Sequence, residues 1–186
     1  MKHDEAVDLI RDAVGRGSGP WSDLGCGAGT FTRALVEILG PRRPIVAVDR
    51  DSAALDELRR WSERHGSDVH VVRADFTRVE EIAELRAGSL DGILLANALH
   101  FVRDAGSVLA RLVPLLRPAA SGTGGGRVVF VEYDRRDASR WVPYPISRDR
   151  LVTLAASAGL SAPTVTASRP SQYQGLLYTA FAERSS

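Results

Sequence analysis

The stretch Asp23-Leu24-Gly25-Cys26-Gly27-Ala28-Gly29-Thr30 joins two segments of different character. Residues 21–24 predict a short strand, whereas apolar side chains from Phe31 to Leu39 recur at helical spacing and stop at Gly40-Pro41. A strand, a glycine turn and a helix form the unit that binds ligands beyond the carboxyl ends of the strands in an open α/β sheet. We therefore expect a ligand site at residues 23–30.

The same stretch lacks the spacing of a dinucleotide-binding loop. That loop requires Gly-x-Gly-x-x-Gly or Ala, but the sixth residue counted from Gly25 is Thr30, and the sixth counted from Gly27 is Thr32. The loop also begins with an acid, Asp23, which suits a ligand that carries a positive group. A nicotinamide-dependent oxidoreductase is therefore disfavoured.

Strands and helices alternate on both sides of this unit. Apolar runs predict strands at 45–48, 69–72, 91–96 and 127–133, and helical spacing predicts helices at 4–14, 51–65, 79–86 and 104–116. This alternation implies right-handed crossovers and a parallel sheet covered on both faces. Residues 119–126, rich in Gly, Ala and Ser, are predicted to be a flexible surface connection.

The last third of the chain has a different pattern. A helix is predicted at 148–158, followed by strands at 164–166 and 175–181 with no helix between them. Two such strands form a hairpin. The expected fold class is therefore α/β, a doubly wound, mostly parallel seven-strand sheet with an antiparallel C-terminal hairpin strand and helices on both faces.

The composition excludes several function classes. Lys2 is the only lysine among 24 basic residues, so a P-loop and a pyridoxal Schiff base both lack their lysine. The net charge is +1, and the arginines are interleaved with acids. A dedicated nucleic-acid surface requires clustered positive charge, so this balance argues against one.

Cysteine and histidine usage is sparse. The single cysteine, Cys26, cannot form an intramolecular disulfide, and the scattered histidines do not supply a metal site. No apolar run approaches the ~20 residues of a membrane-spanning helix, and the N-terminus lacks the pattern of a signal peptide. We expect a cytoplasmic protein without metal or membrane contact.

The motifs together resemble those of class I S-adenosylmethionine-dependent methyltransferases, over roughly residues 20–135. Residues 23–30 resemble the first motif of that family, residues 91–100 its fourth-strand motif, and residues 116–130 the approach to its fifth strand. The resemblance implies S-adenosylmethionine as cofactor and S-adenosylhomocysteine as product. It also implies that Asp49 holds the ribose hydroxyls, that Asp75 accepts from the adenine amine and that Phe76 packs on the ring.

The cofactor contacts expected from this resemblance come from the ends of four strands. They are Asp23, Gly25, Cys26, Gly27, Gly29, Asp49, Arg50, Asp75, Phe76 and Asn97. Alternatives remain for three of them. Asp75 also suits a helix N-cap, and Cys26 a small buried filler. Asn97 either faces the cofactor or stabilises its loop.

The acceptor side is expected on the loops after the fourth and fifth strands. Methyl transfer from a sulfonium needs a general base only when the acceptor must lose a proton, and His100 is the candidate base. A packing or capping role is the alternative for His100. Tyr144, together with Trp141, is the candidate pocket wall, the alternative being that both rings anchor the loop. Arg135, Arg136 and Arg140 suit either an acidic acceptor or a solvated face.

We expect one methyltransferase domain over residues 1–186, with a leading helix and linker at 1–19, a cofactor-binding core at 20–135 and a substrate-side loop, helix and hairpin at 136–186. The absence of a large insertion favours a small-molecule acceptor. The alternatives are a methyltransferase acting on RNA or protein, and a cofactor-binding protein without transferase activity.

Overall fold

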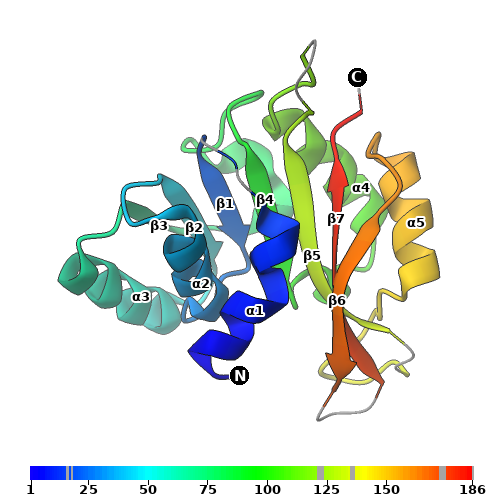
Figure 1. The fold of residues 1–186 in the computed structure, drawn as a ribbon, viewed down its shortest axis with the longest axis horizontal. Helices are drawn as coiled ribbons and strands as arrows, with labels where there is room; N and C mark the ends of the chain where they lie inside the picture. Colours follow the sequence, from blue (N-terminus) through cyan, green and yellow to red (C-terminus); the bar gives the residue numbers. More distant parts are fainter. Residues whose placement is uncertain (16, 18, 121–123, 135–136, 172–174, 186) are drawn as a thin grey trace.

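The computed structural model describes residues 1–186 except 16, 18, 121–123, 135–136, 172–174 and 186 (Figure 1). The middle of the predicted connection at 119–126 therefore lies outside the described residues, and so do Arg135 and Arg136. None of the helices in the described ranges has the length and apolar character needed to cross a bilayer.

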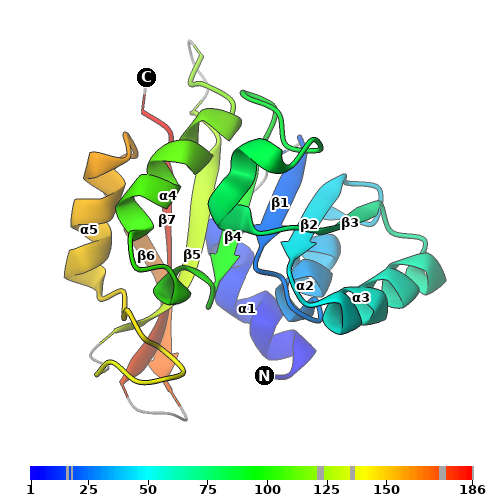
Figure 2. The same cartoon turned by 180° about the vertical axis from the view of Figure 1, so that it is seen from behind.

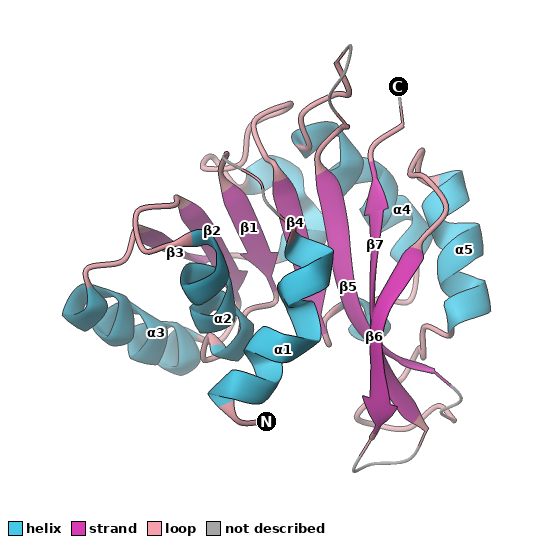
Figure 3. Ribbon diagram, in the orientation of Figure 1, coloured by secondary structure: helices cyan, strands magenta, loops and turns pink. Residues whose placement is uncertain are grey.

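Within the described residues, the regular structure consists of seven strands and five α-helices, with three short 3₁₀ helices between them (Figure 3). The strands are β1 (Trp21–Leu24), β2 (Ile45–Asp49), β3 (Val69–Arg73), β4 (Gly92–Ala96), β5 (Arg127–Asp134), β6 (Thr164–Pro170) and β7 (Leu176–Glu183). The helices are α1 (His3–Val14), α2 (Thr30–Leu39), α3 (Ser52–His65), α4 (Ala105–Leu112) and α5 (Arg148–Ser157), with 3₁₀ helices η1 (Phe76–Glu81), η2 (Leu99–Phe101) and η3 (Val113–Leu115).

All seven strands form one sheet in the order β3-β2-β1-β4-β5-β7-β6. The first five pair in parallel, β7 runs antiparallel to β5, and β6 pairs antiparallel with β7. The strand order reverses between β1 and β4, which is where open α/β sheets bind ligands. The predicted fold class is confirmed.

The sheet is buried on both faces, and its central strand β4 carries apolar residues at successive positions. In β4, Leu94 and Ala96 pack with α1 and α2, whereas Ile93 and Leu95 pack with α4 and α5. Figure 1 shows α1 and α2 in front of the sheet, and Figure 2 shows α4 and α5 in front of its opposite face. Alternate side chains of one strand thus reach two separate cores, as expected for a period of two.

The predicted helix at 79–86 is wrong. The structure has the 3₁₀ helix η1 at Phe76–Glu81 instead, and Ile82 leaves the helical region with φ −98° and ψ 98°. Val79, Ile82 and Leu85 are all buried, and the amides of Ile82 and Leu85 each bond the carbonyl three residues earlier. Apolar residues at a spacing of three fit successive tight turns as well as an α-helix.

The packing of Trp21 against β4 leads to a test of the central sheet. A Cβ atom on Gly92 would lie 2.4 Å from the Trp21 ring, whereas a Cβ on Gly106, in α4, would meet its nearest neighbour at 3.6 Å. We predict that Gly92→Ala lowers the free energy of unfolding by about 1–3 kcal/mol through overpacking. The matched Gly106→Ala should raise it by about 0.5–1 kcal/mol by stiffening the unfolded chain. Urea unfolding measures both, and equal midpoints for the two variants would contradict the packing.

Candidate functional site

A cavity of about 570 Å³ opens where β1, β2 and β4 end, a size typical of ligand sites. It brings together six of the predicted cofactor contacts: Gly25, Asp49, Arg50, Asp75, Phe76 and Asn97. Its other lining residues are Ala74, Thr77, Ala98, Phe101, Val102, Arg103, Asp104, Ser107, Val108 and Arg111. The remaining predicted contacts, Asp23, Cys26, Gly27 and Gly29, belong to the strand and loop beside this cavity.

The glycine loop is held against β2 by backbone hydrogen bonds. The amides of Gly25 and Cys26 donate to the Val48 carbonyl at 2.8 and 3.1 Å. Gly27 has φ +52°, and a Cβ placed on it would meet no atom within 4 Å. Gly29, at φ +84°, instead packs so tightly on Leu58 that a Cβ would lie 2.4 Å away. The loop therefore offers open space at Gly27 and is anchored at Gly29.

The Asp49 carboxylate connects this loop to the end of β2. Its Oδ2 accepts from the Gly27 amide at 2.8 Å, and its Oδ1 accepts from the amides of Arg50 and Asp51 at 2.7 and 2.9 Å. Two carboxylate oxygens have about four acceptor positions, so these three bonds leave capacity for a further donor. The side chain is fixed in orientation and still able to bind a ligand hydroxyl.

Asp75 both caps η1 and lines the cavity. Its Oδ1 accepts from the Thr77 amide at 2.9 Å and from the Thr77 hydroxyl at 2.7 Å, while Arg50 lies 3.5 Å from Oδ2. Partial burial raises the pKa of this carboxyl, but the two Thr77 bonds and the charges of Arg50 and Arg78 outweigh it, and the pKa is lowered overall. An ionised acceptor thus faces the cavity next to the Phe76 ring.

Asn97 holds an unsatisfied acceptor at the end of β4. Its backbone adopts φ +54°, its backbone N–H donates to the Val131 carbonyl at 2.8 Å, and the residue lines the cavity. Its Oδ1 is buried without a hydrogen-bond partner among the described residues. A buried acceptor left unpaired costs about 1–3 kcal/mol, so this atom suits a ligand donor.

Asp23 and Cys26 lie outside the cavity lining. Asp23 is 1% exposed and accepts from the Thr32 hydroxyl at 2.6 Å. The pKa of Asp23 is raised to about 7, chiefly by burial. The charge of Asp49 also raises this pKa, whereas the hydrogen bond from Thr32 lowers it. Burial, with the charges of Asp23 and Asp49, also raises the pKa of the Cys26 thiol, so Cys26 lacks the thiolate of a reactive cysteine.

His100 is buried behind the cavity wall, in η2. It is 2% exposed, and its Nδ1 lies 2.6 Å from Oε2 of Glu132, a β5 residue with no exposed surface. Its ring centroid lies 4.4 Å from that of Phe101, with the two planes tilted by 46°, and Phe101 does line the cavity. The candidate base therefore does not line the cavity itself, although a residue that contacts its ring does.

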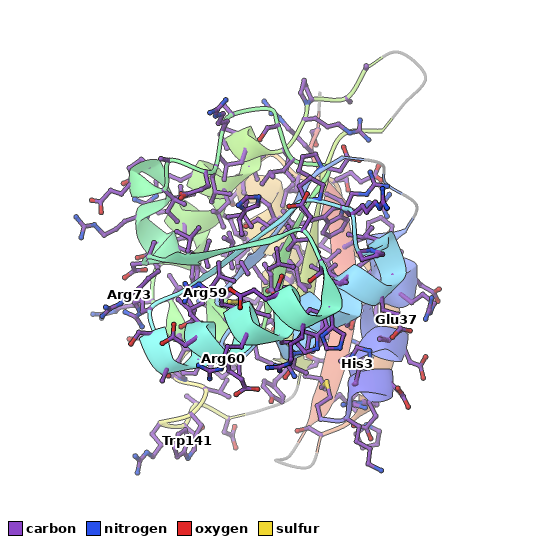
Figure 4. The ribbon with its side chains drawn as sticks, turned by 90° about the vertical axis from the view of Figure 1, so that its left-hand side faces the viewer. His3, Glu37, Arg59, Arg60, Arg73 and Trp141 are labelled. Atoms are coloured by element: carbon purple, nitrogen blue, oxygen red, sulfur yellow. The ribbon has the colours of Figure 1, made fainter. Side chains whose placement is uncertain are left out.

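The two candidate wall aromatics also lie outside the cavity lining. Tyr144 is half-buried, and its backbone amide donates to the His100 carbonyl at 3.0 Å. Trp141 is 66% exposed and projects from the loop into solvent, with the Arg140 guanidinium 4.8 Å from the ring centroid (Figure 4). The loop is attached to the body at Tyr144 through its backbone, and the Trp141 ring does not anchor it.

Sequence reasoning missed the residues of η2 and α4 that line the cavity, and it missed the role of Glu132. A signal for Glu132 was present in the strand pattern. Val128 and Phe130 point to the same buried face of β5, and Glu132 follows them at the same period. A charged residue at a buried position of a strand requires a partner.

Comparison with known proteins adds to this geometry. A family model described as a methyltransferase domain matches residues 22–119, more than half of the chain. The chain belongs to the methyltransferase domain family. Among curated relatives, the ribosomal RNA small subunit methyltransferase H of Delftia acidovorans is 32% identical over 50% of this chain and 28% of its own. The cypemycin N-terminal methyltransferase of a Streptomyces species is 29% identical over 83% of this chain and 66% of its own. The chain thus spans less than two thirds of each of these relatives.

Among solved structures, the 1,6-didemethyltoxoflavin-N1-methyltransferase of Burkholderia thailandensis superposes with a TM-score of 0.75 at 22% identity. The match covers 99% of this methyltransferase-family chain and 78% of that one, which was crystallised with 1,6-didemethyltoxoflavin and S-adenosylhomocysteine. At this identity the likeness shows the fold, including the seven-strand sheet.

The residues of this chain fit S-adenosylmethionine, the cofactor of the class I methyltransferases. The open space at Gly27 leaves room for close approach to the backbone, Asp49 has unused acceptor capacity, and Asn97 has an unpaired buried acceptor. Asp75 adds an ionised acceptor beside an aromatic ring. The cofactor carries the matching donors, namely hydroxyls, an adenine amine and an ammonium group.

The raised pKa of Asp23 predicts a pH-dependent stability. Folded Asp23 keeps its proton up to about pH 7, while the unfolded chain loses it near pH 4, so stability falls as pH rises between these values. Asp23→Asn should remove this loss of stability. The free energy of unfolding of the variant, relative to that of the parent, should therefore rise by roughly 2–4 kcal/mol from about pH 5 to pH 8. Thermal unfolding across pH measures it, with the exposed Asp56→Asn as control. Parallel curves for all three proteins would contradict the burial of Asp23.

Proposed function

We propose that the protein is an S-adenosylmethionine-dependent methyltransferase that acts on a small-molecule acceptor. The observation that carries the proposal is the single cavity that joins the carboxyl ends of β1, β2 and β4 and is lined by Asp49, Asp75 and Asn97. When bound, S-adenosylmethionine supplies an electrophilic methyl group on a sulfonium centre. The whole chain, from the leading helix to the C-terminal hairpin, acts in this proposal as one methyltransferase domain.

The chain's own residues divide the cofactor between them in this proposal. Asp49 and Arg50 face the ribose, and Asp75 and Phe76 face the adenine. Asn97 offers its unpaired Oδ1 from the end of β4. Gly27 lets the backbone approach the amino-acid end of the cofactor, while Gly25 and Gly29 let the loop pack closely on Ala98 and Leu58. Asp23 and Cys26 support this loop from the protein interior.

A small acceptor agrees with the charges around the cavity. Arg50 lies beside Asp75, and Arg111 lies 3.6 Å from Glu80, so acids accompany the arginines at the mouth. Arg59, Arg60 and Arg73 lie at the β3 edge of the molecule in Figure 4, where Arg59 is bonded to Asp56 at 2.6 Å. The ion pairs of Arg50, Arg59 and Arg111 differ from the clustered, unpaired positive charge that binds nucleic acid. A peptide acceptor is the second candidate, favoured by the Streptomyces relative that matches most of this chain.

The direct test is transfer of a labelled methyl group from S-adenosylmethionine to separate pools of small molecules, peptides and RNA. We expect label in the small-molecule pool. Label confined to the RNA or peptide pool would overturn the acceptor class, and unlabelled pools together with absent cofactor binding would overturn the function.

Asp49 leads to a quantitative prediction for the cofactor site. Asp49→Ala removes the acceptor for ribose hydroxyls and releases the Gly27 amide, so affinity for S-adenosylhomocysteine should fall by about 1–3 kcal/mol. Isothermal titration calorimetry measures the change. Asp56→Ala, on the exposed face of α3, is the control and should bind like the parent. Equal affinity for both variants would show that the ribose lies elsewhere.

His100 is the proposed general base, with Tyr144 holding its turn through the bond between their backbones. His100→Gln should therefore keep S-adenosylhomocysteine affinity within about twofold and lower the turnover of the identified acceptor by about 10²–10⁴-fold. Calorimetry measures the S-adenosylhomocysteine affinity, and steady-state kinetics measures the turnover. Unaltered turnover in this variant would remove His100 from the reaction.

A further inference from the structure

Behind the cavity wall, β5 buries a carboxylate that the cofactor site does not use. Glu132 has no exposed surface, and both of its oxygens are engaged. Its Oε1 accepts from the backbone amides of Leu99 and His100 at 3.1 and 3.2 Å, and its Oε2 lies 2.6 Å from Nδ1 of His100. One side chain thus contacts two backbone amides and the imidazole ring of the same short turn, η2.

Burying the Glu132 carboxylate at this position costs desolvation free energy, which calls for an explanation. Val128 and Phe130 occupy the preceding inward positions of β5, and both are fully buried. An apolar residue at position 132 would avoid the desolvation of a carboxylate, and replacing buried ionic pairs by apolar groups is often neutral or stabilising. Packing alone therefore does not account for a glutamate here.

The bond between Glu132 and His100 fixes the state of the imidazole ring. A carboxylate accepts hydrogen bonds, so the proton of the neutral ring stays on Nδ1 and the lone pair lies on Nε2. Among the described residues, no hydrogen bond reaches Nε2. The ring is further confined by Phe101 at 4.4 Å and Tyr133 at 5.8 Å between centroids.

The connection continues from His100 to the cavity. Phe101 is 53% exposed, lines the cavity, and lies in contact with the His100 ring. The two backbone bonds to Glu132 hold the turn that carries both rings. The order from core to ligand is therefore Glu132, His100, Phe101 and the cavity.

We propose that Glu132 is a positioning residue that holds His100 as an Nε2 base, and that the acceptor is consequently a group that must lose a proton, a hydroxyl or an N–H. This inference rests on the proposed function. His100 does not line the cavity in this structure, whereas Phe101, which contacts its ring, does, so the proposal requires the Phe101 side chain to turn aside when the acceptor binds. The proton then passes from the acceptor heteroatom to Nε2, the positive imidazolium lies against the Glu132 carboxylate, and the heteroatom keeps the electron pair that forms the new bond to carbon. The methyl carbon's former bonding pair stays on sulfur, which becomes a neutral thioether.

The isosteric variant Glu132→Gln tests the proposal. Its amide oxygen can still accept from the two backbone amides, but its NH₂ group would donate to Nδ1 and move the ring proton to Nε2. We expect S-adenosylhomocysteine affinity within about twofold of the parent, a ¹⁵N spectrum of His100 that reports the opposite tautomer, and turnover lowered by about 10²–10⁴-fold. Glu183→Gln, which breaks the Arg127 ion pair on the same sheet, is the matched control and should keep tautomer and turnover.

The outcomes separate this inference from the proposed function. An unprotonated Nδ1 in the parent spectrum, a measurement that needs neither variant nor acceptor, overturns the inference. Full turnover in Glu132→Gln overturns it too, as does a loss of turnover without a change of tautomer, which would indicate a structural role. If the parent binds no S-adenosylmethionine, the proposed function fails, whatever the tautomer of His100.

Discussion

The hydrogen bond from the Gly27 amide to Oδ2 of Asp49, at 2.8 Å, is the constraint on which the site depends. It joins the loop after β1 to the end of β2, while the other oxygen of the same carboxylate caps the turn into α3. The positive φ of Gly27 places its amide to make this bond and leaves its Cα facing open space. Loop, strand end and helix start are therefore fixed together, and the cavity forms among them.

Three aspartates of this region show how environment sets the role of one residue type. Asp23, buried under the loop, has its pKa raised to about 7 and bonds only Thr32 among the described side chains. Asp75, at the cavity edge, has its pKa lowered by Thr77 and nearby arginines and offers an ionised acceptor. Asp49 lies between them and is held by backbone amides. Support of the loop, orientation of the backbone amides and an ionised acceptor at the cavity edge are thus distributed over three carboxylates.

Sequence reasoning succeeded where local rules are strict. The glycine loop, the acids that end strands and the C-terminal hairpin follow from residue spacing, and the structure contains the predicted seven-strand sheet. It was wrong at 79–86, where an apolar spacing of three fits tight turns as well as a helix. The positions of Trp141 and Tyr144 outside the cavity lining depend on a long loop whose path no local pattern determines. The partner of His100 came from a strand 32 residues away, a contact set by the register of β4 on β5.

We infer that the loop held by Asp49 forms a site for S-adenosylmethionine and its product. Calorimetric titration of the intact chain with S-adenosylhomocysteine, and separately with NAD, tests this claim most directly. We expect one saturable site for S-adenosylhomocysteine and no measurable heat with NAD under the same conditions. Tight binding of NAD, with no binding of S-adenosylhomocysteine, would contradict it.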